Sequence, residues 1–459
     1  MKKLTYLSIS VLAAFAASCD GQLTQITENE PDSNLTEELT QEEIRALSYS
    51  FNDTRVTEQE ATRQAESIMR FLDSSTPTKS AAGRSISSIK PITKQSAKTK
   101  SGTETDTLAY LFNFSNEQGY TILSADRRTD YILTLVPQGN IDFDEDISED
   151  ILQTGVMVFY GNLYAAYEKQ IERANKLQDS LIESALAKLE ADGTITRAGT
   201  TQLTFEYGTP EYKVAIPKMI PVRWGQDNPY DLSTPIQSGQ HCKTGCVATA
   251  VAQLMAYWRY PSSYNWNVMM PASGNESLAT YQNISQLMYN VGVGVNTKYG
   301  VNSSSAYFDD IPGYLSQLGY NSGNYGAYNQ NKVENSIKNH RPVLIAGSSL
   351  KVDVYTKYLI FWKKYSHTYY DGNHTWLLDG LMNVTTPVVL YNNGNYMQTI
   401  WVYDTMVHCN FGWPELAIDG YYDWGAFNIN NGPVTRSQSV YGENGNYQFN
   451  VECITEIYK

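Results

Sequence analysis

Residues 239–261 read GQHCKTGCVATAVAQLMAYWRYP, and this stretch decides how the second half of the chain folds. Gly245 permits a sharp turn, and the apolar residues that follow it recur at the spacing of one helix face. Those residues are Val247, Val251, Leu254, Met255 and Trp258. Pro261 prevents the helix from continuing. The pattern therefore predicts a turn that runs directly into a helix, with Cys246 at or near the helix N-terminus.

A cysteine in that position is suited to nucleophilic chemistry. The unpaired backbone N–H groups and the dipole at a helix N-terminus favour negative charge, so they lower the pKa of a thiol and populate its thiolate. The residues alone leave a structural alternative open, in which Cys242 and Cys246 form a disulfide or pack as small apolar side chains. A nucleophilic cysteine needs a base, so a suitably placed histidine would favour the catalytic interpretation over the structural one.

His374 is the strongest candidate for that base. It lies in GNHTWLLDG, residues 372–380, at the end of an expected strand that would hold the imidazole rigidly. Asn410, in HCNFGW, could accept the second ring N–H and fix the tautomer, while Trp413 shields the pair. His241 is closer to Cys246 in sequence, but it lies in the loop that approaches the helix and is a weak candidate on geometric grounds.

Metal sites are not expected. His408 and Cys409 are adjacent, yet no second spaced pair of His or Cys completes a tetrahedral zinc site. Asp142, Asp144 and Asp146 alternate as in a calcium loop, but the required glycine and terminal glutamate are missing, so a solvated acidic turn is the better interpretation.

Composition excludes several classes of protein. The 459 residues include 48 acidic and 34 basic side chains and are 42% hydrophobic, which rules out wholesale disorder. The acidic balance, without a run of Lys and Arg, argues against a general nucleic-acid binder. Five cysteines are too few for a disulfide scaffold, and Cys409 and Cys453 are interpreted as packed thiols. All eight Trp and all five His lie after residue 200, which indicates two units with different roles.

The N-terminus has the features of a secretory signal. Two lysines precede an apolar run over residues 4–17 that is too short to span a bilayer. Ala16, Ala17 and Ser18 stand directly before Cys19 and resemble a bacterial lipobox, although the motif more often has Leu where this chain has Ala16. We therefore expect acylation of Cys19, membrane contact only through that lipid anchor, and a location in the bacterial cell envelope. The alternative is an ordinary cleaved signal and secretion.

The first half of the chain alternates helical and extended patterns. One or two amphipathic helices are expected over Gln41–Leu72, and a loop or linker over Ser74–Asp106. A strand pair is expected at Leu108–Phe114 and Tyr120–Ser124, followed by a long helix over Asp150–Glu190.

The second half begins after an exposed joint at residues 194–202, where proteases tend to cut. Arg197, Lys213 and Lys218 are candidate cut sites. Short strand-like runs then recur between Gly and Asn turns: Pro342–Ala346, Trp376–Leu378 and Thr399–Val402.

Four motifs in a fixed order give a resemblance to a known family. Trp224-Gly225-Gln226, Thr244–Ala250, Gly372–Gly380 and Asn410–Trp413 together resemble the streptopain family of papain-like cysteine peptidases, over about residues 215–430. The resemblance implies an α+β fold, in which a helical part carries the Cys and an antiparallel sheet carries the His. Family members are zymogens with an α+β pro-domain. The implied division is a signal peptide at 1–18, an inhibitory pro-domain at 19–200 and a papain-like catalytic domain at 201–459.

The resemblance also implies a role for each site residue. Cys246 would be the nucleophile and His374 the general base and acid. Gln226 would donate to the oxyanion beside the backbone N–H of Cys246. Asn410 would orient the imidazole, and Trp413 would cover it. No cofactor is implied, and the expected partners are protein or peptide substrates and the chain's own pro-domain.

The chain departs from the family pattern near the site. Phe411 replaces a Trp, Pro414 and Glu415 replace glycines, and Asn373 stands where Gly is common, so the loop after Trp413 is expected to be stiffer or differently placed. Two segments, Gly347–Tyr370 and Leu381–Val402, resemble insertions on either side of His374. We expect both near the cleft, where they would affect substrate preference.

The favoured interpretation is thus a secreted cysteine endopeptidase that becomes active after its pro-domain is removed. Two alternatives remain open. A cell-wall amide hydrolase or transpeptidase would use the same residues, because they do not define which amide is attacked. A catalytically silent or inhibitory surface lipoprotein of the same fold would leave Cys246 unreactive toward an active-site-directed thiol reagent.

Overall fold

The structure is a computed structural model that describes residues 39–51, 53–75, 83–95, 105–141, 155–191, 193, 195, 203–359, 362–416, 418–424 and 449–459. The expected signal peptide, Cys19, the acidic run at 142–146 and Arg197 lie outside these ranges. Within them, none of the helices has the length and apolar character that crossing a bilayer requires.

The N-terminal part is a four-stranded antiparallel meander covered by helices. Its helices are α1 (Gln41–Phe51), α2 (Glu58–Ser75) and α4 (Gly155–Ala191), and its strands are β1 (Ile86–Gln95), β2 (Thr105–Phe114), β3 (Tyr120–Ser124) and β4 (Ile132–Val136), with a 3-10 turn, η1 (Ser115–Glu117), between β2 and β3. Apolar residues of α2, among them Ala65 and Ile68, pack on Phe112 and Leu123 of the sheet. The expected helices and the strand pair are confirmed.

The prediction of a loop or linker over Ser74–Asp106 is wrong, because this segment contains β1. The strand pairs with β2 from Ile86↔Phe114 to Gln95↔Thr105. It lies at the end of the strand order, so it needs only one backbone partner, and its side chains are at most half-buried. An edge strand can therefore be polar and can hold Pro91, which leaves little signal in the sequence.

The helical portion of the second half surrounds the helix that begins at Cys246. A small hairpin of β7 (Ile236–Gln237) and β8 (Gln240–His241) precedes α5 (Cys246–Trp258), and α6 (Trp266–Met269), α7 (Leu278–Gly294) and α8 (Asp310–Gln317) follow. Buried side chains of α5 pack against α7 and α8; examples are Val251 and Leu254 against Leu287 and Leu315. The predicted amphipathic α5 is confirmed as a central buried helix.

The sheet portion of the second half is antiparallel and long. It contains β5 (Leu203–Tyr207), β6 (Glu211–Ile216), β9 (Asn321–Ala327), α9 (Gln330–Lys338), β10 (Val343–Leu359), β11 (Trp362–Asn392), β12 (Asn395–Asn410), the 3-10 turn η2 (Pro414–Leu416), β13 (Gly420–Asp423) and β14 (Phe449–Tyr458). The three short strand-like runs of the sequence fall within β10, β11 and β12, apart from Pro342, which precedes β10. The α+β fold class is therefore confirmed.

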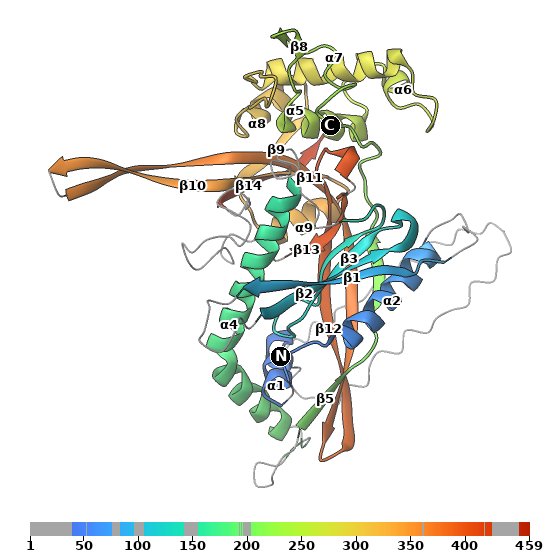
Figure 1. Cartoon of the computed structure of the whole chain (residues 1–459), viewed down its shortest axis with the longest axis vertical. Coiled ribbons are helices and arrows are strands. Elements are labelled where there is room, and N and C mark those ends of the chain that lie inside the picture. Colours follow the sequence, from blue (N-terminus) through green and yellow to red (C-terminus); the bar gives the residue numbers. More distant parts are fainter. Residues whose placement is uncertain are drawn as a thin grey trace, which may run out of the picture.

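One sheet joins the two parts of the chain. Its order is β1-β2-β3-β4-β13-β12-β11-β10-β14-β9, and β5 and β6 also pair with β11. The junction is the antiparallel pairing of β4 with β13, where Leu135 faces Tyr421 and Thr134 faces Tyr422. Figure 1 shows the meander β1–β3 at mid-height beside β12, above the tip of the β11–β12 hairpin, with α5 and α7 at the top of the molecule. The N-terminal part is thus continuous with the sheet that carries His374.

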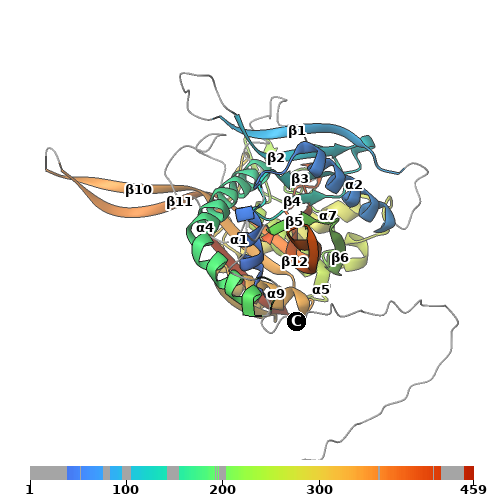
Figure 2. The ribbon, with the colours of Figure 1, turned by 90° about the horizontal axis from the view of Figure 1, so that it is seen from below.

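The two segments that resemble insertions lie in two long hairpins. The β10–β11 ribbon starts beside the Gly347↔His374 pair and projects from the body (Figures 1 and 2). The β11–β12 hairpin, which contains residues 381–402, runs away from α5 toward α1 and α4 (Figure 1). Its Val388 and Leu390 pack with Leu47 of α1 and Leu189 of α4. The expectation that residues 381–402 lie near the cleft is therefore wrong, because this hairpin instead supports the N-terminal part.

Candidate active site

Cys246 is the first residue of α5, as the sequence predicts. Gly245 before it has φ +89°, in the left-handed region, and a Cβ at this position would lie 3.2 Å from the carbonyl oxygen of Ser304. A glycine is therefore required for the turn that aims Cys246. The cysteine is not in a disulfide, and neither is Cys242, Cys409 or Cys453. The disulfide alternative for Cys242 and Cys246 is thus wrong.

The thiol of Cys246 faces strand β11. The backbone and the hydroxyl of Thr375 lie close to its sulfur, as do the backbone N–H groups of Val247 and of Cys246 itself, and each of these groups acts to lower the pKa of the thiol. Burial nevertheless raises the pKa of Cys246 above its ordinary value, because desolvation outweighs these effects. In this arrangement the sulfur is a protonated thiol at neutral pH.

His374 is the residue immediately before Thr375 and is 2% exposed. Its Nε2 lies 3.1 Å from the carbonyl oxygen of Phe411, so Nε2–H is the donor. The ring stacks on Trp413, with centroids 4.0 Å apart and planes 13° apart. Burial lowers the pKa of His374 to about 3 despite the bond to Phe411, which keeps the imidazole neutral.

Strand geometry explains why the two motifs meet through Thr375. Successive side chains of a strand point to opposite faces. Trp376 shares one cluster with Phe411 and Trp413, whereas Leu377 belongs to the cluster that contains α5. The residue of β11 that meets the Cys246 sulfur is Thr375, and His374 packs with the aromatic residues of the other cluster.

Asn410 connects α5 to the end of β12. Its Oδ1 accepts from Gln253 Nε2 at 3.1 Å and from Gly412 N at 3.2 Å, and its Nδ2 donates to the carbonyl oxygen of Val222 at 3.2 Å. The hydrogen bond of His374 goes to the next residue in the chain, Phe411. Asn410 thus fixes the loop that carries the acceptor for His374.

Gln226 lies beside the turn that leads to Cys246. Its carbonyl oxygen accepts from Thr244 N at 3.1 Å, and Trp224 N donates to Gln253 Oε1 at 3.1 Å. The Trp224–Gln226 segment is therefore held against the N-terminal end of α5, and the Gln226 side chain is half-buried there.

The sequence assigned no role to two residues that shape this site. Gln253 is completely buried on the apolar face of α5, and a polar residue on such a face was the available signal. Asp419 Oδ1 accepts from Phe411 N at 2.9 Å, and its Oδ2 lies 3.0 Å from Arg223 Nε. No local pattern marks Asp419, because its partners lie far away in the chain or on the opposite side of a turn.

The remaining histidines of the sequence argument have separate contacts. His408 Nδ1 lies 2.6 Å from Asp379 Oδ1 in a buried pair, and Asp379 Oδ2 accepts from Ile220 N. His241 Nδ1 lies 3.0 Å from the carbonyl oxygen of Thr234 in the approach hairpin. In the described ranges, His, Cys, Asp and Glu side chains form no group of three that could hold a metal ion.

Comparisons with known proteins match both parts of the chain. Residues 224–263 and 262–422 match the Peptidase C10 family, and residues 53–154 match the family described as Spi protease inhibitor. The chain is 28% identical over 288 residues to streptopain of Streptococcus pyogenes serotype M1, an alignment that covers 52% of this chain and 64% of streptopain. It is 21% identical over 224 residues to the thiol protease/hemagglutinin PrtT of Porphyromonas gingivalis, which covers 46% of this chain and 23% of PrtT. The chain thus spans less than two thirds of the length of these relatives.

Among solved structures, a fragment of prointerpain A from Prevotella intermedia is 17% identical and covers 81% of this chain and 99% of its own, with a TM-score of 0.45. Active interpain A from the same organism is 20% identical and covers 53% of this chain and 95% of its own, with a TM-score of 0.34.

Proposed function

Because the chain belongs to the streptopain family of cysteine peptidases and carries a Spi-like region ahead of the peptidase region, we propose that it is a cysteine endopeptidase made as a zymogen. One observation carries this proposal. The N-terminus of α5 and strand β11 come together so that the Cys246 sulfur contacts the residue next to His374. Two sequence motifs that are distant in the chain therefore form one site.

In the proposed reaction, the Cys246 thiolate attacks the carbonyl carbon of a peptide bond and the C–N bond breaks to leave an acyl-enzyme. His374 takes the thiol proton and gives it to the leaving amine, and then it deprotonates the water that hydrolyses the thioester. The Gln226 amide and the backbone N–H of Cys246 stabilise the oxyanion. Asn410 and Trp413 position the imidazole.

The observed site supports a latent state. A thiol with a raised pKa and an imidazole with a lowered pKa form a neutral pair rather than a thiolate with an imidazolium. The Nε2–H of His374 is also engaged by the carbonyl oxygen of Phe411. With the proton on Nε2, the unprotonated Nδ1 is the ring atom that would take the proton of the Cys246 thiol.

The Spi-like region can impose this state through the sheet. Its strand β4 pairs with β13, and β13 follows the loop that holds Phe411 and Asp419. Removal of the Spi-like region would leave β13 with β12 as its only neighbour in the described sheet. The loop that accepts the hydrogen bond of His374 would then lose one of its supports.

The proposal includes the domain boundaries and the location. Residues 1–18 would be a signal peptide, 19–200 the inhibitory pro-domain and 201–459 the catalytic domain. Secretion, with a lipid anchor at Cys19, would place the enzyme at the bacterial cell envelope. Its substrates would be proteins or peptides.

Casein digestion tests this function. The chain without residues 1–18 is incubated with casein beside a Cys246→Ala variant and a Cys453→Ala control, and products are followed by mass spectrometry. We expect the parent and the Cys453→Ala control to lose residues before about 203 and then to digest casein, while Cys246→Ala stays intact. If a separately expressed 203–459 fragment is also inert toward casein, the endopeptidase proposal fails; turnover of peptidoglycan by that fragment would assign cell-wall amide hydrolysis instead.

A further inference from the structure

The side chain of Arg223 connects two segments of the candidate active site. Arg223 lies directly before the segment 224–226, and its side chain contacts the loop after β12. Its Nε donates to Asp419 Oδ2 at 3.0 Å, and its Nη2 donates to the carbonyl oxygen of Pro414 at 3.3 Å. One side chain therefore holds this loop at two points.

The loop after β12 carries the contacts of the imidazole. Asp419 Oδ1 accepts from Phe411 N at 2.9 Å, and the carbonyl oxygen of Phe411 accepts from His374 Nε2 at 3.1 Å. Trp413, in the same loop, stacks on the imidazole with centroids 4.0 Å apart. A continuous series of contacts thus leads from the guanidinium of Arg223 to the ring of His374.

The segment 224–226 also packs directly on this loop. A Cβ at Gly225 would lie 3.1 Å from Pro414 Cδ, and Gly225 immediately precedes Gln226, the proposed oxyanion donor. The backbone of Arg223 has a contact of its own, because its carbonyl oxygen accepts from the Tyr230 hydroxyl at 3.4 Å. The segment that would stabilise the oxyanion is therefore joined to the loop after β12 by both side-chain and backbone contacts.

The ion pair between Arg223 and Asp419 is buried at its acidic end. The side chain of Asp419 is 10% exposed, whereas that of Arg223 is 36% exposed. Burial raises the pKa of Asp419, and the positive charge of Arg223 is the strongest effect that opposes this rise. A carboxylate left at this position without its arginine would be a costly buried charge. The two residues therefore form one unit.

Building on the proposed peptidase function, we propose that Arg223 and Asp419 are a positioning pair, which sets His374 relative to Gln226 and keeps the imidazole proton on Nε2. The unprotonated Nδ1 is then the ring atom that can accept the thiol proton of Cys246. The pair acts through the backbone of the loop after β12 and is not itself part of the proton transfer.

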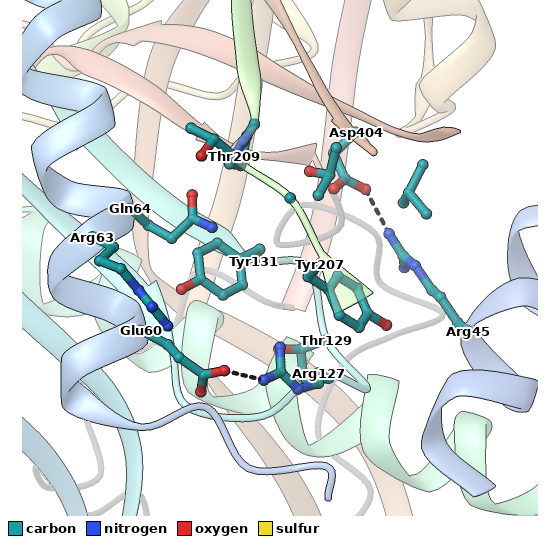
Figure 3. Close-up of a pocket in the computed structure, with 14 residues that line it drawn as sticks. Arg45, Glu60, Arg63, Gln64, Arg127, Thr129, Tyr131, Tyr207, Thr209 and Asp404 are labelled. Carbon is teal, nitrogen blue, oxygen red and sulfur yellow. Dashed lines mark hydrogen bonds and ion pairs between the residues drawn. The ribbon is translucent and has the colours of Figure 1, made fainter. Parts of the chain in front are cut away.

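The pair would persist in the processed enzyme, because both of its residues lie in the peptidase region. Arg45 and Asp404 differ in this respect, since they join α1 to β12 and their contact is lost together with α1 (Figure 3). Strand β13 directly follows Asp419 and loses its neighbour β4 at the same step. The contacts of Arg223 would then hold the loop after the Spi-like region has gone.

Nitrogen-15 NMR of the histidine rings tests the positioning without requiring peptidase activity. The protein is the chain without residues 1–18 that carries Cys246→Ala and is labelled at its histidines. The signals of His374 are those that disappear in His374→Gln. In this parent we expect a protonated Nε2 whose proton exchanges slowly with solvent. In Arg223→Gln the exchange should be about tenfold faster or more, the usual result of losing a charge-assisted contact, while the signals of His241 stay unchanged.

Two further variants separate positioning from a loss of folding. Arg223→Lys keeps the charge opposite Asp419 but not the planar fork, so its exchange rate should lie between those of the parent and Arg223→Gln. Asp419→Asn keeps an oxygen that can accept from Phe411 N, so it should fold even if Arg223→Gln does not, and it should also exchange faster than the parent. Glu456→Gln is the matched control, because it breaks an ion pair with Arg341 that lies on β14 rather than in the loop after β12.

Kinetics of the matured full chain provide a second readout. Arg223→Gln should lower kcat on a peptide substrate by about tenfold or more with little change in KM, because misplacing His374 affects the transition state and not substrate binding. Exchange rates in Arg223→Gln and Asp419→Asn that equal the rate in the parent, or a kcat no lower than that of Glu456→Gln, would overturn the proposal. If the matured parent hydrolyses no peptide, the proposed function fails, whereas the ring signals still decide whether the pair holds His374.

Discussion

Replacing His374 by Gln is expected to remove much of the acid sensitivity of the intact chain. Burial lowers the pKa of His374 to about 3, whereas its ordinary value is 6.5. The unfolded chain therefore binds more protons between these two values, so the stability contributed by neutral His374 is complete above pH 6.5 and is lost as the pH falls toward 3. From pH 7 to pH 5, linkage gives a loss of about 2 kcal/mol in the free energy of unfolding.

Urea unfolding of the chain with Cys246→Ala, at pH 5, 6 and 7, measures this loss. Glutamine keeps an N–H donor for the carbonyl oxygen of Phe411 but does not titrate. Adding His374→Gln should therefore reduce the fall in stability between pH 7 and pH 5 by about 2 kcal/mol. His340→Gln is the matched control, because it removes an exposed histidine, and it should leave the fall unchanged. An equal fall in His374→Gln and its parent would refute the claim that buried, neutral His374 makes the intact chain sensitive to acid.

Three further predictions follow from the site and from the contacts between the two parts. Gln226→Ala should lower kcat of the processed enzyme on a peptide substrate by about 10²–10³ with little change in KM, the usual effect of losing an oxyanion donor, while the exposed Gln286→Ala should not. Leu189→Ala should cost the zymogen about 2–5 kcal/mol in urea unfolding and speed its maturation on gels, because Leu189 is buried against the β11–β12 hairpin. Burial raises the pKa of Asp404 to about 7, so the parent loses stability as the pH rises from 4 through 7, whereas Asp404→Asn does not titrate. Asp404→Asn should therefore become more stable relative to its parent over that range. Equal urea midpoints of the two chains across the range would contradict this.

Local signals allowed the elements around Cys246 to be predicted. A glycine with positive φ, an apolar period of 3.6 and a terminating proline all act within one stretch, so the start of α5 follows from the sequence. The long helix α4 and the helices α1 and α2 show the same kind of periodicity. Strand β1 was missed, because an edge strand depends on backbone pairing with β2 rather than on apolar side chains.

The contacts inside the site required the three-dimensional structure. The motifs identified Cys246 and His374. They do not show which side chain of β11 faces the sulfur, because that depends on the strand register, with Gly347 opposite His374, and on the face of the sheet to which each side chain points. The bond from His374 to Phe411 depends in turn on Asp419, Gln253 and Asn410, which come from different elements. The position of residues 381–402 followed from packing against α1 and α4, and no pattern within that segment indicates these partners.

The central claim is that the Spi-like region keeps Cys246 and His374 as a neutral pair. The most direct test is the pH dependence of alkylation of Cys246 by iodoacetamide, which is followed by peptide mass spectrometry. Two proteins are compared: the intact chain with Gln226→Ala, and a separately expressed 203–459 fragment with the same substitution. We predict that Cys246 in the intact chain needs a more alkaline pH to react than an ordinary thiol, because burial raises its pKa. In the fragment it should react near neutral pH, as a thiolate paired with His374. The same pH profile in a folded fragment and in the intact chain would contradict the account.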